Sequence, residues 1–117
     1  MSGPRYILVV EDEPLIAMLL GDVLESIGKH MVGPADSVTD ALALIAAGGI
    51  EAAILDLRLR GGETSVAIAQ ALEAAGIPFV FTSGGGIESI APDFAGHPLL
   101  GKPFTIDAVA EALDGLY

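Results

Sequence analysis

Residues 6–14 read YILVVEDEP: five apolar residues, three acids and a proline. An apolar run without alternation is typical of a strand covered on both faces, as in a parallel sheet. Pro14 suits the first position of a helix, because that position needs no backbone N–H. This stretch therefore predicts a strand followed by a helix, with acidic side chains where the strand ends.

Similar apolar runs recur along the chain, and each ends at polar or charged residues. We predict strands at Ala52–Leu55, Phe79–Phe81 and Leu99–Leu100, with a weaker strand, nearer a sheet edge, at His30–Gly33. Five short strands are separated by segments in which the apolar residues recur with a different spacing. This alternation is typical of a parallel α/β sheet.

Between the strands the apolar residues recur with helical spacing. One face is predicted from Ile16, Leu19, Leu20, Val23, Leu24 and Ile27, with Gly28 as C-terminal cap. Further helices are expected from the Ser37 N-cap through Ala46, over Thr64–Ala75, and after the Thr105 N-cap, where Ile106, Val109, Leu113 and Leu116 form the apolar face. The expected fourth helix follows Gly84–Gly86 and is interrupted by Pro92, so we expect a short or mobile element. The predicted fold is a doubly wound (βα)5 α/β domain over residues 1–117.

Composition excludes several classes of protein. The chain has 16 Asp plus Glu against 5 Lys plus Arg, a net charge of −11, and no cysteine. The charge argues against nucleic acid and anionic membranes as partners, and the missing thiols exclude disulfides, thiolate metal sites and a cysteine nucleophile. The longest uncharged stretch, Ala74–Ile87, is too short to span a bilayer. Without a signal peptide at the start, we expect a cytoplasmic protein.

Chemistry-bearing residues follow four of the predicted strands. In a parallel α/β sheet ligands bind at the carboxyl ends of the strands. The residues found there are Glu11, Asp12, Glu13, Asp56, Thr82, Ser83 and Lys102. Converging carboxylates favour a hard divalent cation such as Mg²⁺, beside which one carboxylate can act as nucleophile toward phosphorus. A hydroxyl and an ammonium group would bind the phosphoryl oxygens.

Each of these residues also has an ordinary structural interpretation. The acids of 11–13 can complement a helix dipole, and the polar residues after the other strands can be turn formers. The chemical interpretation requires all four groups at their strand ends, and all four are present. His30 and His97 are isolated, and the glycine runs match no phosphate-binding loop.

From Tyr6 to Leu116 the chain resembles the receiver domain of response regulators in two-component phosphorelay signalling. The motifs that carry the resemblance are residues 9–14, 55–57, 81–84 and 102–104, in this order and at these separations. The resemblance implies a flavodoxin-like, CheY-like fold. It also implies that Asp56 accepts a phosphoryl group from a phosphohistidine.

The resemblance assigns roles to further residues. Mg²⁺ would be held by Asp12, by Glu11 through water, by Asp56 and by the backbone carbonyl of Arg58. Lys102 would bind the phosphoryl group, with a cis peptide bond to Pro103. The switch hydroxyl is assigned to Ser83, five residues after Pro78 and just before a glycine, with Thr82 as the alternative.

Some positions depart from the family pattern. Leu99 stands three residues before Lys102, where the family often has an aromatic residue whose rotamer changes with the switch hydroxyl. The loop after Asp56 carries Arg58 and Arg60 but lacks the usual proline. The segment 81–86 resembles a single-domain α-proteobacterial subgroup with a Phe-x-Thr-Gly motif and a mobile fourth helix. In such a protein, ordering of this segment would be the readout of phosphorylation.

We therefore expect a phosphoacceptor switch rather than an enzyme. Its partners would be a sensor histidine kinase or histidine phosphotransfer protein and a downstream protein effector, and it would be a monomer or weak dimer. One alternative is a phosphate sink or a pseudo-receiver that only mediates interactions. Another is a phosphatase with an aspartyl nucleophile, although Arg58 stands where its acid/base aspartate would be.

Overall fold

The computed structural model describes residues 5–83, 99–101 and 105–116. In chain order the elements are β1 (Tyr6–Val10), α1 (Pro14–Ser26), β2 (His30–Ala35), α2 (Val38–Ala47), β3 (Ala52–Asp56), a short 3₁₀ turn (Arg60–Gly62), α3 (Val66–Ala74), β4 (Phe79–Ser83), β5 (Leu99–Gly101) and α5 (Ile106–Asp114). The predicted fourth helix lies outside the described residues.

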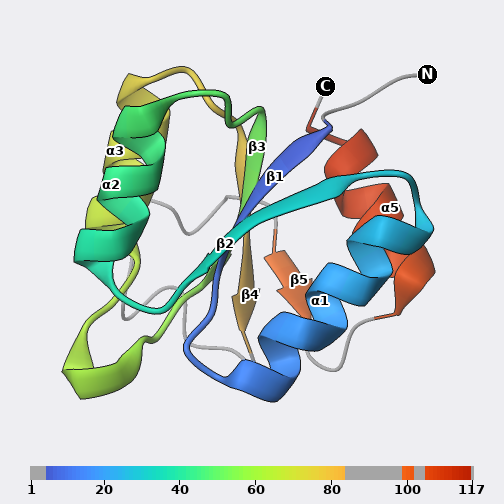
Figure 1. Cartoon of the computed structure of the whole chain (residues 1–117), viewed down its shortest axis with the longest axis horizontal. Helices are drawn as coiled ribbons and strands as arrows, with labels where there is room; N and C mark the ends of the chain where they lie inside the picture. Colours follow the sequence, from blue (N-terminus) through green and yellow to red (C-terminus); the bar gives the residue numbers. More distant parts are fainter. Residues whose placement is uncertain (1–4, 84–98, 102–104, 117) are drawn as a thin grey trace.

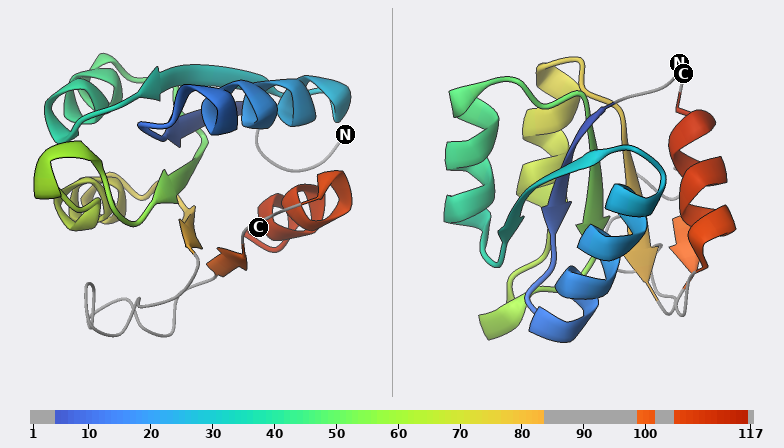
Figure 2. Two further views of the ribbon diagram at one scale, coloured as in Figure 1. Left: turned by 90° about the horizontal axis from the view of Figure 1, so that it is seen from below. Right: turned by 45° about the vertical axis from the view of Figure 1, so that its right-hand side comes forward.

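The five strands form one parallel sheet in the order β2-β1-β3-β4-β5. α2 and α3 cover one face of the sheet and α1 and α5 cover the other (Figures 1 and 2). The predicted doubly wound parallel sheet is confirmed, and β2 lies at an edge as expected. In the described part of the chain, no helix is long and apolar enough to cross a membrane.

Strand alternation divides the interior into two cores. Leu8, Leu55 and Phe81 pack with α2 and α3, in the α2/α3-side core. Ile7, Ile54 and Val80 pack with α1 and α5, in the α1/α5-side core. Because successive strand residues point to opposite faces, continuous apolar strands supply both cores at once. This explains why the strand sequences show no polar alternation.

The predicted starts of α1, α2 and α5 are confirmed. The Ser37 hydroxyl accepts a hydrogen bond from Asp40 N at 3.1 Å, and Thr105 Oγ1 accepts one from Ala108 N at 3.1 Å. Pro14 occupies the first turn of α1. Each bond satisfies one of the donors that a helix start leaves without an intrahelical partner.

The predicted apolar faces are wrong at two positions. Leu19 is 50% exposed and Ile106 is 48% exposed. The buried stripe of α1 runs through Ala17, Leu20, Val23 and Leu24 instead. α3 also begins at Val66, two residues later than predicted, after the loop that follows β3.

Candidate functional site

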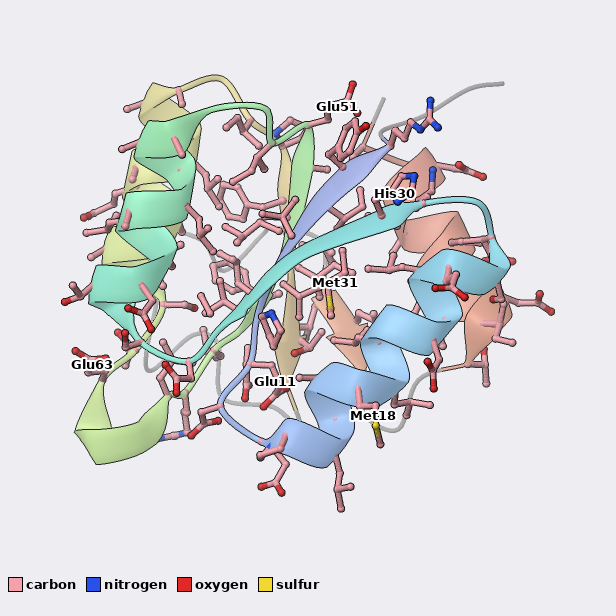
Figure 3. All side chains as sticks on the ribbon, in the orientation of Figure 1. Glu11, Met18, His30, Met31, Glu51 and Glu63 are labelled. Carbon is pink, nitrogen blue, oxygen red and sulfur yellow. The ribbon has the colours of Figure 1, made fainter. Side chains whose placement is uncertain are left out.

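Two acidic residues meet where the two central strands end. Val10 of β1 pairs with Leu55 of β3, so the next residues, Glu11 and Asp56, continue the same register. Both are buried; Asp56 is 9% exposed. Figure 3 shows Glu11 at the carboxyl end of β1, between the sheet and the start of α1. Parallel pairing thus brings together carboxyl groups 45 residues apart in sequence.

Asp12 completes an acidic cluster, by which we mean Glu11, Asp12 and Asp56. Each contributes one carboxylate oxygen, and these oxygens all lie within 4.8 Å of one another. Three negative charges at this spacing repel, and burial strengthens the repulsion. The set consists of hard oxygen donors, which is the chemistry that Mg²⁺ prefers. The predicted metal ligands Glu11, Asp12 and Asp56 therefore come together in a set that fits a divalent cation.

Backbone contacts fix the orientation of Glu11. Its N–H donates to the carbonyl of Ala35 at 2.9 Å, which extends the β1–β2 pairing by one step. The N–H of Glu13 donates to Glu11 Oε2 at 3.1 Å. One carboxylate oxygen is thereby held by the turn into α1. This positioning bond was not predicted from the sequence, although acids before a helix start are its usual signal.

The loop after Asp56 folds back on itself. Leu59 N donates to Glu63 O at 2.8 Å and Ser65 N donates to Leu57 O at 3.1 Å, so Arg58 and Thr64 form an antiparallel bridge. These bonds engage the carbonyl of Leu57 and the N–H of Leu59, rather than the Arg58 carbonyl between them. The role of that carbonyl as a metal ligand stays a prediction.

The hydroxyl and ammonium groups are described only in part. Thr82 pairs with Asp56 across β3 and β4 and is buried, 1% exposed. Ser83 is the last residue of β4, but its side chain lies outside the described residues. Lys102, and with it the predicted cis bond to Pro103, lies outside them as well. Their predicted roles stay predictions.

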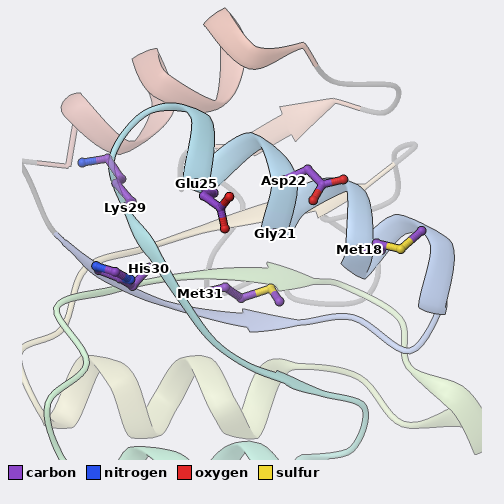
Figure 4. Close-up of a pocket in the computed structure, with 7 residues that line it drawn as sticks. All are labelled: Met18, Gly21, Asp22, Glu25, Lys29, His30 and Met31. Atoms are coloured by element: carbon purple, nitrogen blue, oxygen red, sulfur yellow. The ribbon is translucent and has the colours of Figure 1, made fainter.

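A separate hollow of about 360 Å³ lies between α1 and β2 (Figure 4). Met18 and Met31 supply its apolar lining, and Asp22, Glu25, Lys29 and His30 supply charged or polar groups. None of its lining residues belongs to the acidic cluster. The carboxyl ends of β1 and β3 are therefore the better candidate for the chemistry.

Comparison with known proteins places the fold in a family. No family model matches the chain, and no curated protein does. SdrG from Sphingomonas melonis Fr1 is 55% identical in its solution structure, with a TM-score of 0.88, 99% of this chain covered and 98% of SdrG. The chain belongs to the response-regulator receiver domains.

Further solved structures of receiver domains share the fold. A BeF3-activated solution structure of SdrG, attributed to Pseudomonas melonis Fr1, matches at 56% identity and a TM-score of 0.80, over 97% of this chain and 96% of that one. The response regulator PhyR from Brucella abortus is 29% identical over 98% of this chain but only 48% of its own, with a TM-score of 0.82. The receiver domain of the Pseudomonas aeruginosa kinase PA1611, which has a magnesium ion in its active-site cleft, matches at 19% identity and a TM-score of 0.84, over 98% of each chain.

Proposed function

We propose that this receiver domain is a phosphoacceptor in two-component signalling, with Asp56 as the residue that takes the phosphoryl group. The observation that carries the proposal is the place of Asp56 in the acidic cluster at the carboxyl end of β3, the middle strand of the sheet. Of the three acids, Asp56 is the one fixed within a strand, with Glu11 and Asp12 grouped beside it.

The proposed reaction is the transfer of a phosphoryl group from a phosphohistidine of a sensor kinase or phosphotransfer protein. An oxygen of Asp56 forms a bond to phosphorus while the bond from phosphorus to the histidine nitrogen breaks. Glu11, Asp12, Asp56 and the Arg58 carbonyl are the groups that would hold Mg²⁺. When bound, the cation offsets the repulsion between the carboxylates and the incoming phosphoryl oxygens.

The remaining residues would bind the product. We assign to Lys102 the compensation of the added negative charge, and to the Ser83 hydroxyl a hydrogen bond to a phosphoryl oxygen. Aspartyl phosphate adds negative charge and acceptor oxygens at the end of β3. Hydrogen-bond donors and cations of neighbouring segments are attracted to them. The output would be an altered surface for a protein effector.

SdrG supports this proposal because it has a BeF3-activated conformation and is 56% identical to the chain. BeF3⁻ has the shape and charge of a phosphoryl group bound to a carboxylate. PhyR of Bartonella quintana, at 27% identity, is an anti-anti-sigma factor, which favours a protein rather than a nucleic acid as the output partner. We propose a cytoplasmic signalling protein without sustained enzymatic turnover, acting as a monomer or weak dimer.

Intact-mass analysis tests the proposal directly. The wild type is incubated with Mg²⁺ and acetyl phosphate, alongside Asp56→Asn, in which a neutral amide of similar shape replaces the nucleophile. We expect a single phosphoryl adduct on the wild type and none on the variant. Equal adducts on both proteins, or no adduct on either, would contradict the proposal. Sustained Mg²⁺-dependent release of phosphate from many donor molecules would favour the phosphatase alternative instead.

A further inference from the structure

A buried hydroxyl beside Asp56 has no bonding partner among the residues that the structure describes. Thr82 Oγ1 is fully shielded and makes no hydrogen bond there. Burying a hydroxyl without a hydrogen bond costs folding free energy, and such groups are rare in folded proteins. Ser65 Oγ is buried in the same way, so it is the position of Thr82 beside Asp56 that indicates a ligand bound in another state of the protein.

The sheet register places Thr82 on the same face as Asp56. Ile54 and Val80 pair across β3 and β4, and both pack in the α1/α5-side core. Asp56 and Thr82 are the next pair on that face, because strand side chains alternate with a period of two. Neighbouring strands lie about 4.8 Å apart. The hydroxyl is therefore one strand away from the proposed phosphoacceptor.

The other neighbours of Thr82 on this face are apolar. On its β5 side Thr82 pairs with Leu100, which belongs to the α1/α5-side core, and Val80 precedes it on the same face. Across β3, β4 and β5 the row reads Asp56, Thr82 and Leu100, and Glu11 lies beside Asp56 in the acidic cluster. Within the described row, the acidic side is the one where the hydroxyl can find an acceptor.

We propose that Thr82 is a second hydroxyl of the phosphorylation site, which donates a hydrogen bond to the phosphoryl-bearing side chain of Asp56 and has no such bond before phosphorylation. This inference rests on the proposed function and is additional to the role assigned to Ser83. In the unmodified protein the buried hydroxyl lacks a hydrogen bond and is destabilising. In the phosphorylated protein it makes a stabilising hydrogen bond. Thr82 thereby raises the free energy of the unmodified state and lowers that of the phosphorylated state.

The test is Thr82→Val, which keeps the shape of the side chain and removes the hydroxyl. Binding of BeF3⁻ with Mg²⁺ is followed by NMR titration, and the melting temperature is measured without either. We expect the variant to melt at the same or a higher temperature than the wild type, because an unsatisfied polar group is gone. We expect its affinity for BeF3⁻ to fall about tenfold or more, the loss typical of a hydrogen bond to a charged group.

Two further variants separate this role from a structural one. Thr82→Ser keeps the hydroxyl and should bind BeF3⁻ like the wild type, whereas Thr82→Ala should bind as weakly as Thr82→Val; this pair decides the matter if Thr82→Val does not fold. Ser65→Ala is the matched control, since Ser65 Oγ is also buried without a partner among the described residues but lies at the start of α3. It should leave the affinity unchanged.

The outcomes distinguish this proposal from the proposed function. If the wild type binds BeF3⁻ and Thr82→Val binds within about twofold of it, the role of Thr82 is overturned while the phosphoacceptor proposal stands. An equal loss in Ser65→Ala also overturns it, because the effect would not be local. If the wild type itself binds no BeF3⁻, the proposed function fails, and the role of Thr82 with it.

Discussion

Charge repulsion dominates the acidic cluster at the scale of single residues. The carboxylate oxygens of Glu11, Asp12 and Asp56 lie within 4.8 Å of one another. The N–H of Glu13 donates to one carboxylate oxygen of Glu11. Grouped anions of this kind are unfavourable in the metal-free protein. A divalent cation relieves this repulsion, which couples the stability of the domain to its proposed cofactor.

Asp12→Asn should therefore stabilise the metal-free domain. Removing one of three mutually repelling charges is worth about 1–3 kcal/mol at this separation. Thermal unfolding in a chelator should show a higher melting temperature for the variant. Added Mg²⁺ should raise the melting temperature of the wild type more than that of the variant, because the variant has lost a ligand.

Asp22→Asn provides the control for net charge. Asp22 lies on the exposed side of α1, so the same change there should alter stability by less than about 0.5 kcal/mol. If Asp12→Asn lowers the melting temperature in chelator, repulsion between the three acids does not destabilise the metal-free domain, and the metal-site interpretation loses its physical basis.

At the scale of elements, hydrogen bonds at their ends determine where strands and helices begin. Ser37 and Thr105 cap α2 and α5 through their side chains, whereas Ser65, at the corresponding position of α3, makes no side-chain cap bond. The amino ends of β1 and β3 are joined by Glu51, which accepts bonds from Arg5 N at 2.8 Å and Tyr6 N at 3.0 Å. These contacts lie away from the proposed site and serve stability.

Ser37→Ala should destabilise the domain by about 1 kcal/mol, the usual cost of losing an N-cap side chain. Ser65→Ala should not lower the free energy of unfolding through the loss of a cap, because the Ser65 hydroxyl caps no helix. Chemical denaturation of both variants measures the contrast. A larger loss for Ser65→Ala than for Ser37→Ala would show that the assignment of caps is wrong.

Glu51 makes part of the stability dependent on pH. The backbone hydrogen bonds from Tyr6 and Arg5 lower the pKa of Glu51 below its ordinary value of 4.5. The folded state thus favours the carboxylate, so its contribution is complete above the unfolded pKa and is lost as pH falls through the lower folded pKa. Glu51→Gln should be less stable than the wild type at neutral pH, and the difference should vanish in acid. A difference that grows in acid would contradict this account.

Sequence patterns predicted the existence of these elements better than their exact ends and faces. β2 was expected to end at Gly33 but continues through Pro34 to Ala35, which an edge strand tolerates because one side needs no partner for its N–H groups. Leu19 and Ile106 fit the helical spacing yet are exposed. Spacing does not determine how a helix is rotated on the sheet to within one residue.

The candidate site is a product of the whole molecule. Parallel strands in the order β2-β1-β3-β4-β5 bring together residues that are far apart in the sequence. The rule that strand ends carry the site was enough to predict the acidic cluster. It was not enough to predict the unsatisfied state of Thr82, because face and burial depend on the register between β3 and β4.

Reductive trapping tests the central claim, phosphorylation of Asp56, most directly. Borohydride reduces an acyl phosphate to an alcohol with loss of phosphate, so a phosphorylated aspartate becomes homoserine, which peptide mass mapping locates. After treatment with Mg²⁺ and acetyl phosphate, we predict this mark at Asp56 and at neither Glu11 nor Asp12. A mark on another residue, or none while the protein stays folded, would contradict the account.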